Sequence, residues 1–249
     1  MTKPTDAHSL KNLDQIQLAR FAIDVLRRSM LHYGIWFNEV VHQLGLKEAI
    51  RIEQEVSASI FPLATKRLAK TIGFETRSDL PAWLIDMERE KLVSLIDAMC
   101  VNWLADDGVW FQAVENSHGM YTGKRCNDTC WSRYSPLEAA MIKSFLHLPE
   151  HAGLAGLERA LGFRLYARIN EQTTERSGNE LIFRMVKCRV QEARERRGLP
   201  DYPCKSAGVV EYQTFADTID SRIRTDCIAC PPDDHPGEWS CAWRFHISE

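Results

Sequence analysis

The chain has 249 residues, of which 45% are hydrophobic and 26% are charged, and its 31 basic and 34 acidic side chains give a formal net charge of −3. This balance excludes a disordered polar chain, a collagen-like fibre and a strongly basic nucleic-acid-binding protein. A chain of this length can bury a hydrophobic core without disulfide bonds. The eight cysteines are the unusual feature, because the first 99 residues contain none of them.

The N-terminal segment predicts the compartment. Residues 1–14 lack the apolar core of a signal peptide, and Asp97 and Asp106 interrupt the longest apolar stretches well short of a membrane span. We therefore expect a cytoplasmic protein with no membrane partner and no nucleic-acid partner. In a reducing cytoplasm, clustered cysteines are more often metal ligands, redox-active thiols or buried apolar residues than structural disulfides.

After a tail at residues 1–12, the sequence contains an internal repeat. A shift of 74 residues aligns Gly34-Ile-Trp-Phe37 with Gly108-Val-Trp-Phe111, and residues 34–63 share eight identities with residues 108–137. Average composition would give roughly two identities in such a window. We therefore predict two helical repeats, at residues 13–80 and 81–161.

Each repeat is predicted to contain the same helices. An amphipathic helix ends at a glycine, a short helix with a Trp-Phe pair follows, and a longer helix begins after a second glycine and is kinked or interrupted by a proline. The predicted breaks in the two copies are Gly34 and Gly108, Gly45 and Gly119, and Pro62 and Pro136. We expect Trp36, Phe37, Trp110 and Phe111 to pack as a core between the copies.

The second copy carries carboxylates that the first copy lacks. Asp107, Glu115, Asp128 and Glu138 stand where the first copy has Tyr33, Val41, Gln54 and Ala64. A polar pocket, a metal site with oxygen ligands and a solvated helix face all produce such a pattern. The three cysteines of this copy, Cys100, Cys126 and Cys130, are predicted to be packing residues.

Residues 162–249 are predicted to form a cysteine-rich α+β module. Alternation predicts a strand over residues 163–169, and Gly178-Asn179 is a turn before a second strand at 181–186. Two helices follow, at 188–197 and around 209–219, and two closing strands lie at 223–228 and 239–247. The predicted fold class is α+β: duplicated helical units followed by a small antiparallel sheet with two helices, in the order ββααββ.

Five cysteines lie at the ends of these predicted elements or within the last one: Cys188, Cys204, Cys227, Cys230 and Cys241. The Cys227-Ile-Ala-Cys230 pair has the spacing with which two thiolates reach one metal ion. The five are therefore predicted metal ligands, with zinc as the first choice and an iron–sulfur cluster as the second. A reactive dithiol or simple burial, with no metal, are the alternatives.

Several motifs of the second half resemble a family of uncharacterised prokaryotic cytosolic proteins. The motifs are Cys188-Arg-Val-Gln-Glu-Ala-Arg194, Gly198-Leu-Pro-Asp-Tyr-Pro-Cys-Lys205, Phe215-Ala-Asp-Thr-Ile-Asp220, Cys227-Ile-Ala-Cys-Pro-Pro-Asp233 and Trp239-Ser-Cys-Ala-Trp243, with Asn102–Phe111 before them. More distantly, the module is similar to aminothiazoline-carboxylate hydrolase-like proteins and to vinyl-reductase-type ligand-binding domains, which are related to a trafficking-complex subunit fold. That similarity implies a small-molecule pocket, a homodimer, and a ligand or metal site near Cys241.

The leading hypothesis is a metal-binding protein with a cysteine-lined site for a small organic ligand, acting as a hydrolase of a C–N or C–S bond. Cys241, His235, Asp233 and Glu115 are the candidate catalytic residues. The sequence has no H-E-x-x-H, G-x-S-x-G, G-x-G-x-x-G or phosphate-loop motif to support catalysis. The alternatives are a ligand- or redox-sensing module without turnover and an assembly role of the helical repeats.

Overall fold

The computed structural model describes residues 10–198 and 200–247 and mixes helices with antiparallel sheets, which confirms the α+β class. The chain divides into two compact units at Leu63 and Ala64. Most of the predicted N-terminal tail, residues 1–9, lies outside the described residues.

The first unit is a pair of long helices. A short 3-10 helix, η2 (Leu10–Asn12), precedes α1 (Gln15–Leu44), and α2 (Leu46–Ile72) begins in this unit. Asp14 and Gln17 form a reciprocal capping box at the start of α1, with hydrogen bonds of 2.8 and 2.9 Å. The side chain of Tyr33 in α1 donates a 3.0 Å hydrogen bond to Glu53 in α2.

The first glycine of each repeat does not end a helix, so that prediction is wrong. Helix α1 continues through Gly34, and α4 (Arg89–Phe145) continues through Gly108. A helix-interior glycine costs only about 1 kcal/mol, which long flanking helical segments offset.

The break comes instead at the second glycine of each repeat. Gly45 has φ 87° and ψ 161°, and Gly119, 74 residues later, has φ 83° and ψ 164°. Residues with a side chain rarely adopt a backbone conformation with this positive φ, so glycine is the residue that permits the bend. The same bend at equivalent positions gives each repeat the same two-helix design.

The predictions for the prolines and tryptophans of the repeats are tested only in part. Pro62 lies inside α2 and Pro136 inside α4, so neither proline interrupts its helix, and the alternative prediction of a kink stays a prediction. Trp36 is 63% exposed and Trp110 is 62% exposed. Trp36 and Trp110 lie in different units, so the predicted core between the copies stays a prediction.

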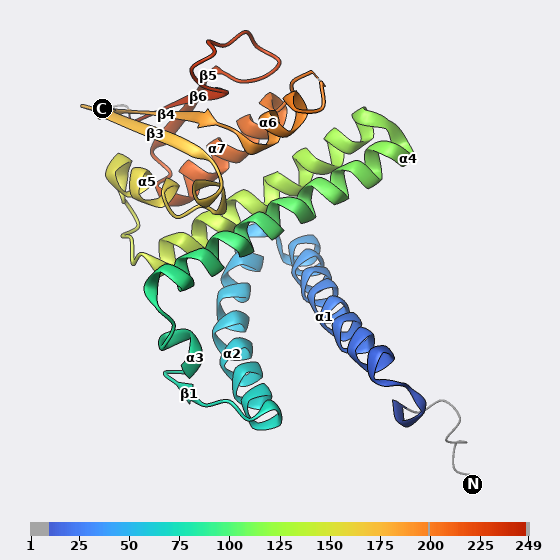
Figure 1. Cartoon of the computed structure of the whole chain (residues 1–249). Coiled ribbons are helices and arrows are strands. Elements are labelled where there is room, and N and C mark those ends of the chain that lie inside the picture. The colour runs from blue at the N-terminus through green and yellow to red at the C-terminus, as the bar shows by residue number, and fades with distance from the viewer. Residues whose placement is uncertain (1–9, 199, 248–249) are drawn as a thin grey trace. The chain divides into compact units, whose positions relative to one another are not determined.

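The second unit begins with the end of α2, which is followed by a short connection and a long helical hairpin. Strands β1 (Thr76–Arg77) and β2 (Leu80–Pro81) pair, and helix α3 (Ala82–Ile85) leads towards α4. Helix α4 folds back on itself at Gly119, and its two arms lie side by side (Figure 1). Trp103 and Trp131, one on each arm, have ring centroids 6.1 Å apart in an edge-to-face contact.

The remaining elements form a four-stranded antiparallel sheet and its helices. In chain order they are α5 (Gly153–Leu161), η3 (Leu165–Arg168), β3 (Glu171–Ser177), β4 (Glu180–Lys187), α6 (Arg189–Glu195), α7 (Lys205–Ile219), β5 (Ile223–Ala229) and β6 (Cys241–Ile247). The strand order is β3-β4-β6-β5, so β3 and β5 are the edges. Gly178 and Asn179 form the predicted two-residue turn, because Ser177 pairs with Glu180.

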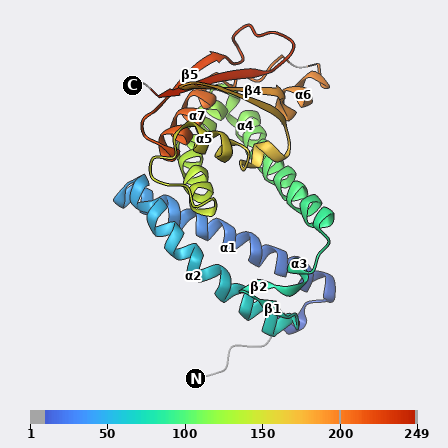
Figure 2. The same cartoon turned by 90° about the vertical axis from the view of Figure 1, so that its left-hand side faces the viewer.

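The unit is layered. Helix α7 packs on α4 on one side and on β5 on the other, and α5 contacts α7 and the strands β4 and β6 (Figures 1 and 2). The fully buried side chains include Leu157 of α5, Phe215 of α7, Phe183 of β4, and Trp243 and Phe245 of β6. The core therefore lies between the inner face of the sheet and these helices.

The strand predicted over residues 163–169 is wrong. Residues 165–168 form η3, and the edge strand begins at Glu171. Arg164 is turned inward to a buried ion pair, so the apparent alternation did not reflect the two faces of a strand. Every residue of β3 except Gln172 is exposed, which leaves this strand without apolar periodicity.

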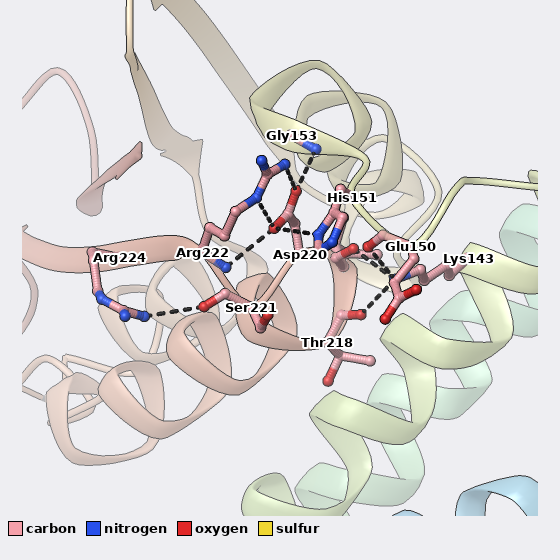
Figure 3. Close-up of polar contacts among 10 residues, drawn as sticks. Lys143, Glu150, His151, Gly153, Thr218, Asp220, Ser221, Arg222 and Arg224 are labelled. Carbon is pink, nitrogen blue, oxygen red and sulfur yellow. Dashed lines mark hydrogen bonds and ion pairs between the residues drawn. The ribbon is translucent and has the colours of Figure 1, made fainter. Parts of the chain in front are cut away.

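A buried aspartate joins α7 to α5. Asp220 follows the last residue of α7, its side chain is fully buried, and it accepts hydrogen bonds from the Gly153 backbone N–H (2.9 Å) and from the Arg222 guanidinium (2.7 and 3.0 Å), as Figure 3 shows. His151 lies 3.8 Å from the same carboxylate. The Arg222 hydrogen bonds hold the pKa of Asp220 well below its usual range.

Lys143 of α4 contacts the same end of α7, next to Asp220. Its ammonium group donates hydrogen bonds to the carbonyl oxygens of Glu150 (3.1 Å), Thr218 (3.2 Å) and Ile219 (2.7 Å) (Figure 3). Two of these carbonyls belong to the last turn of α7, where helix carbonyls lack partners within the helix. Lys143 therefore ties the end of α7 to α4.

Cysteine burial in α4 agrees only in part with the packing prediction. Cys100 is buried, whereas Cys126 and Cys130 are exposed, so the prediction is wrong for the latter two.

Among the described helices, none is both long and apolar enough to cross a membrane.

Candidate functional site: an aromatic cavity with four thiols

The second unit contains a cavity of about 610 Å³. Its walls come from both arms of α4, from α6 and α7, and from β4 and β6. Apolar side chains such as Leu104, Met185 and Val190 line much of it. A cavity of this size accommodates a small organic molecule.

Aromatic rings form the most distinctive part of the wall: Phe111, Trp131, Tyr166, Tyr202, Tyr212 and Trp243. They are held in pairs. Trp131 stacks on Tyr166 with centroids 5.5 Å apart, Tyr212 stacks on Trp243 at 4.7 Å, and Phe111 meets Tyr202 edge to face at 5.1 Å. Because each ring is supported by another, the wall is preorganised for a flat or apolar ligand.

Four of the five cysteines predicted as ligands also line this cavity: Cys188, Cys204, Cys230 and Cys241. They come from separate places in the fold, because Cys188 precedes α6, Cys204 precedes α7, Cys230 follows β5 and Cys241 begins β6. Element ends that are far apart in the sequence thus bring four thiols to one cavity.

The thiols contact one another. The Cys230 thiol is in hydrogen-bond contact with the thiols of Cys204 and Cys241, and these contacts, together with burial, raise its pKa. Burial raises the pKa of Cys188 to about 12. The side-chain amide of Gln191 donates a 3.2 Å hydrogen bond to the Cys204 sulfur. Cys188 and Cys230 are therefore protonated thiols at neutral pH, and not the thiolates that nucleophilic attack requires.

The donor set suits a soft metal ion, because thiolates select zinc and iron–sulfur clusters. The arrangement of these side chains in the structure does not suit a metal ion. Within residues 10–198 and 200–247, no three His, Cys, Asp or Glu side chains are grouped so that they could hold a metal ion. The zinc or iron–sulfur site stays a prediction.

Three of the predicted site residues lie away from the cavity wall. Cys227 is partly buried against the hydrophobic core, and burial raises its pKa. Asp233 accepts two hydrogen bonds from Lys205, at 2.8 and 2.9 Å. His235 lies 3.5 Å from Asp201 and stacks on the Trp239 ring. The C-x-x-C pair is therefore divided, with Cys230 on the cavity and Cys227 outside it.

The carboxylates of the second repeat have different environments. Asp107 and Glu115 line the cavity, with Phe111 between them on the same face of α4. Asp128 instead pairs with Lys124 at 3.1 Å, and Glu138 is buried in an ion pair. Of the predicted catalytic residues, the cavity thus brings together Cys241 and Glu115.

The ion pair of Glu138 lies directly behind the cavity. The fully buried Arg164 guanidinium donates a 3.0 Å hydrogen bond to Glu138 and lies 2.6 Å from Glu211 of α7. Glu211 lines the cavity, and burial raises its pKa despite the arginine. One buried cation is thus shared by two buried carboxylates.

The sequence interpretation missed most of the wall. Tyr166 lies in the segment 163–169 that was predicted to be a strand, and Tyr202 lies outside regular secondary structure, so nothing local marks either residue as inward-facing. The sequence did indicate Asp107 as a candidate site residue, because it is one of the carboxylates that the second repeat carries and the first lacks.

The model of a family of unknown function (DUF6125) matches residues 85–247, which include every residue of the cavity wall. No curated protein and no solved structure matches the chain. These findings give no support to the two distant similarities, to hydrolase-like proteins and to vinyl-reductase-type domains.

Proposed function

We propose a function from the cavity itself, since the chain belongs to a family whose function is unknown (DUF6125). The proposal is that the protein binds a small organic molecule between α4, α6 and α7, with thiols and aromatic rings in contact with it. The observation that carries this proposal is the convergence of four thiols, from four separate element ends, on one aromatic cavity.

The composition of the wall supports binding of a ligand over simple core packing. A packed core leaves few voids larger than a water molecule, whereas about 610 Å³ is open here beside buried Trp131, Tyr212 and Trp243. Leaving such an apolar surface unfilled forgoes dispersion contacts, which a ligand restores.

A neutral apolar fluorophore, N-phenyl-1-naphthylamine, tests this proposal. Ala105 is an exposed residue of α4 on the cavity wall, so Ala105→Trp should fill the cavity without disturbing the core. Ala98 is exposed on the same helix but away from the wall, so Ala98→Trp is the matched control. We expect binding to the native chain and to A98W, and loss of at least about tenfold in affinity for A105W. Equal binding to all three proteins would overturn the proposal.

A soft-metal site at the same thiols is the second candidate, favoured by the contact of Cys230 with Cys204 and Cys241. A zinc ion would hold thiolates there and act as a Lewis acid towards a bound ligand. Elemental analysis of the purified chain, combined with titration of free thiols before and after unfolding, tests it. One zinc or iron per chain with four protected thiols would support the metal, and metal-free protein with four free cavity thiols would overturn it.

Hydrolysis of a C–N or C–S bond stays a prediction of the sequence. The cavity supplies Cys241 and Glu115 for such chemistry but places His235 and Asp233 elsewhere. Cys241→Ser is the direct test of any turnover that is found: loss of activity with an unchanged thermal midpoint supports a chemical role, and unchanged activity excludes one.

A further inference from the structure

Asp107 differs from Glu138 and Glu211, the two buried carboxylates that share Arg164. In the part of the chain that the structure describes, its carboxylate has no hydrogen bond and no ion pair, although it lines the cavity and is only partly exposed. Burial raises the pKa of Asp107, and its neighbour Asp106 raises it further. A carboxylate in such a place costs stability when it is ionised, because nothing in the protein compensates its charge.

The charges around Asp107 do not neutralise it. Two buried cations of this region already have partners. Arg164 is shared by Glu138 and Glu211, and Lys124 pairs with Asp128 and lies 4.6 Å from the centroid of the Tyr202 ring. The arginines that line the cavity come from α6 and the residues after it, namely Arg189, Arg194, Arg196 and Arg197. Arg194 donates to the Pro200 carbonyl at 2.6 Å, and none of the four lowers the pKa of Asp107. Asp107 is therefore an uncompensated negative group on the wall.

The rings near Asp107 are suited to a cation. The negative charge of Asp107 contributes to raising the pKa of Tyr166 and of Tyr202, so both phenol rings lie within its electrostatic range. Phe111, one helical turn from Asp107, contacts the Tyr202 ring. Aromatic faces and a carboxylate together are the surroundings in which proteins hold organic ammonium groups.

The first repeat shows what the second has changed. At the position equivalent to Asp107, Tyr33 donates a hydrogen bond to Glu53 and joins its two helices. In the second repeat the equivalent pair is Asp107 and Asn127, and the Asn127 amide donates instead to the Tyr202 hydroxyl at 3.3 Å. The larger tyrosine is replaced by a short carboxylate that remains open to the cavity.

We propose that Asp107 binds the positively charged nitrogen of an organic cation, an alkylammonium or amidinium group, whose apolar part packs against the aromatic wall. The inference rests on the proposed small-molecule function and names its ligand class. An anionic ligand drawn to the α6 arginines is the competing outcome.

Three probes of one shape test the charge preference: benzylammonium, benzyl alcohol and benzoate, titrated calorimetrically at pH 7. Asp107→Asn removes the charge with little change of shape, and Asp106→Asn is the matched control, because Asp106 is exposed and away from the wall. We expect the native chain and D106N to prefer benzylammonium over benzyl alcohol by about tenfold, and D107N to lose this preference.

The outcomes separate the two proposals. A preference for benzoate, or a benzylammonium preference that persists in D107N, overturns the cation site while leaving the cavity as a ligand site. Failure of all three probes to bind the native chain overturns both. Stability is a second readout: D107N should unfold at the same or higher denaturant concentration than the native chain at pH 7, because an uncompensated charge is removed. Marked destabilisation of D107N would show a structural role and overturn the assignment.

Discussion

Removing the buried guanidinium of Arg164 should destabilise the second unit strongly. The Arg164 side chain is 3% exposed, and those of Glu138 and Glu211 are 7% and 9% exposed. Arg164→Met keeps most of the volume but leaves two carboxylates buried without their cation. Breaking a buried ion pair from one side costs about 3 to 5 kcal/mol, so we expect a loss of this size in the free energy of unfolding, measured by urea denaturation at pH 7.

The matched control is Arg244→Met. Arg244 pairs with Asp226 at 2.8 Å, but both side chains are about half exposed, at 45% and 46%. An exposed pair contributes under about 1 kcal/mol. If R164M costs no more than R244M, the reasoning about burial is refuted.

The pH dependence of R164M gives an independent check. Burial already raises the pKa of Glu211, and without Arg164 nothing opposes that effect. An acid whose folded pKa exceeds its unfolded value contributes stability below the unfolded pKa and loses it as pH rises through the folded pKa. The deficit of R164M should therefore be larger at pH 8 than at pH 5. A deficit independent of pH would instead indicate a packing defect.

Three further changes test other parts of the fold. Asp220→Ala should lower the free energy of unfolding by about 2 to 4 kcal/mol, because it leaves Arg222 and the Gly153 N–H without their acceptor. Because the pKa of Asp220 is lowered in the folded chain, the difference in thermal unfolding between this variant and the native chain should be present at pH 7. It should shrink as the pH falls below the usual pKa of an aspartate, near 4. Lys143→Met should lower the free energy of unfolding by about 1 to 3 kcal/mol by leaving carbonyls at the end of α7 unpaired, and an unchanged urea midpoint would contradict this. Gly119→Ala should cost about 1 to 2 kcal/mol because of its positive φ, whereas Gly108→Ala, inside the straight part of α4, should be neutral or stabilising, and equal effects would contradict the assignment of the bend.

The sequence predicted the inner strands and the two helices of the module well, because their buried residues repeat at regular spacing. In β4, Leu181, Phe183 and Met185 alternate with more exposed neighbours, and that pattern located the strand. The edge strand β3 was missed because the sequence Glu171–Ser177 has no buried face. Its position is set by hydrogen bonds to β4, which leave no mark on local hydrophobicity.

The site was only partly visible in the sequence. The position of the cysteines at element ends indicated that their thiols could meet at one site. The structure places Cys230 and Cys241 together on the cavity. Spacing alone also grouped Cys227 with them, yet it lies outside the cavity wall. Two residues between cysteines limit the distance between them along the chain, but the direction of each side chain depends on strand pairing and on the turn after Ala229.

The edge strand β3 bears on how copies of this chain could associate. An unprotected sheet edge offers free backbone groups to a neighbouring molecule. Three of the seven residues of β3 are charged, Glu171, Glu175 and Arg176, and all are exposed. The cost of desolvating these charged side chains opposes the addition of another strand. The charged residues of β3 thus protect this edge of the sheet against strand exchange and amyloid-like growth.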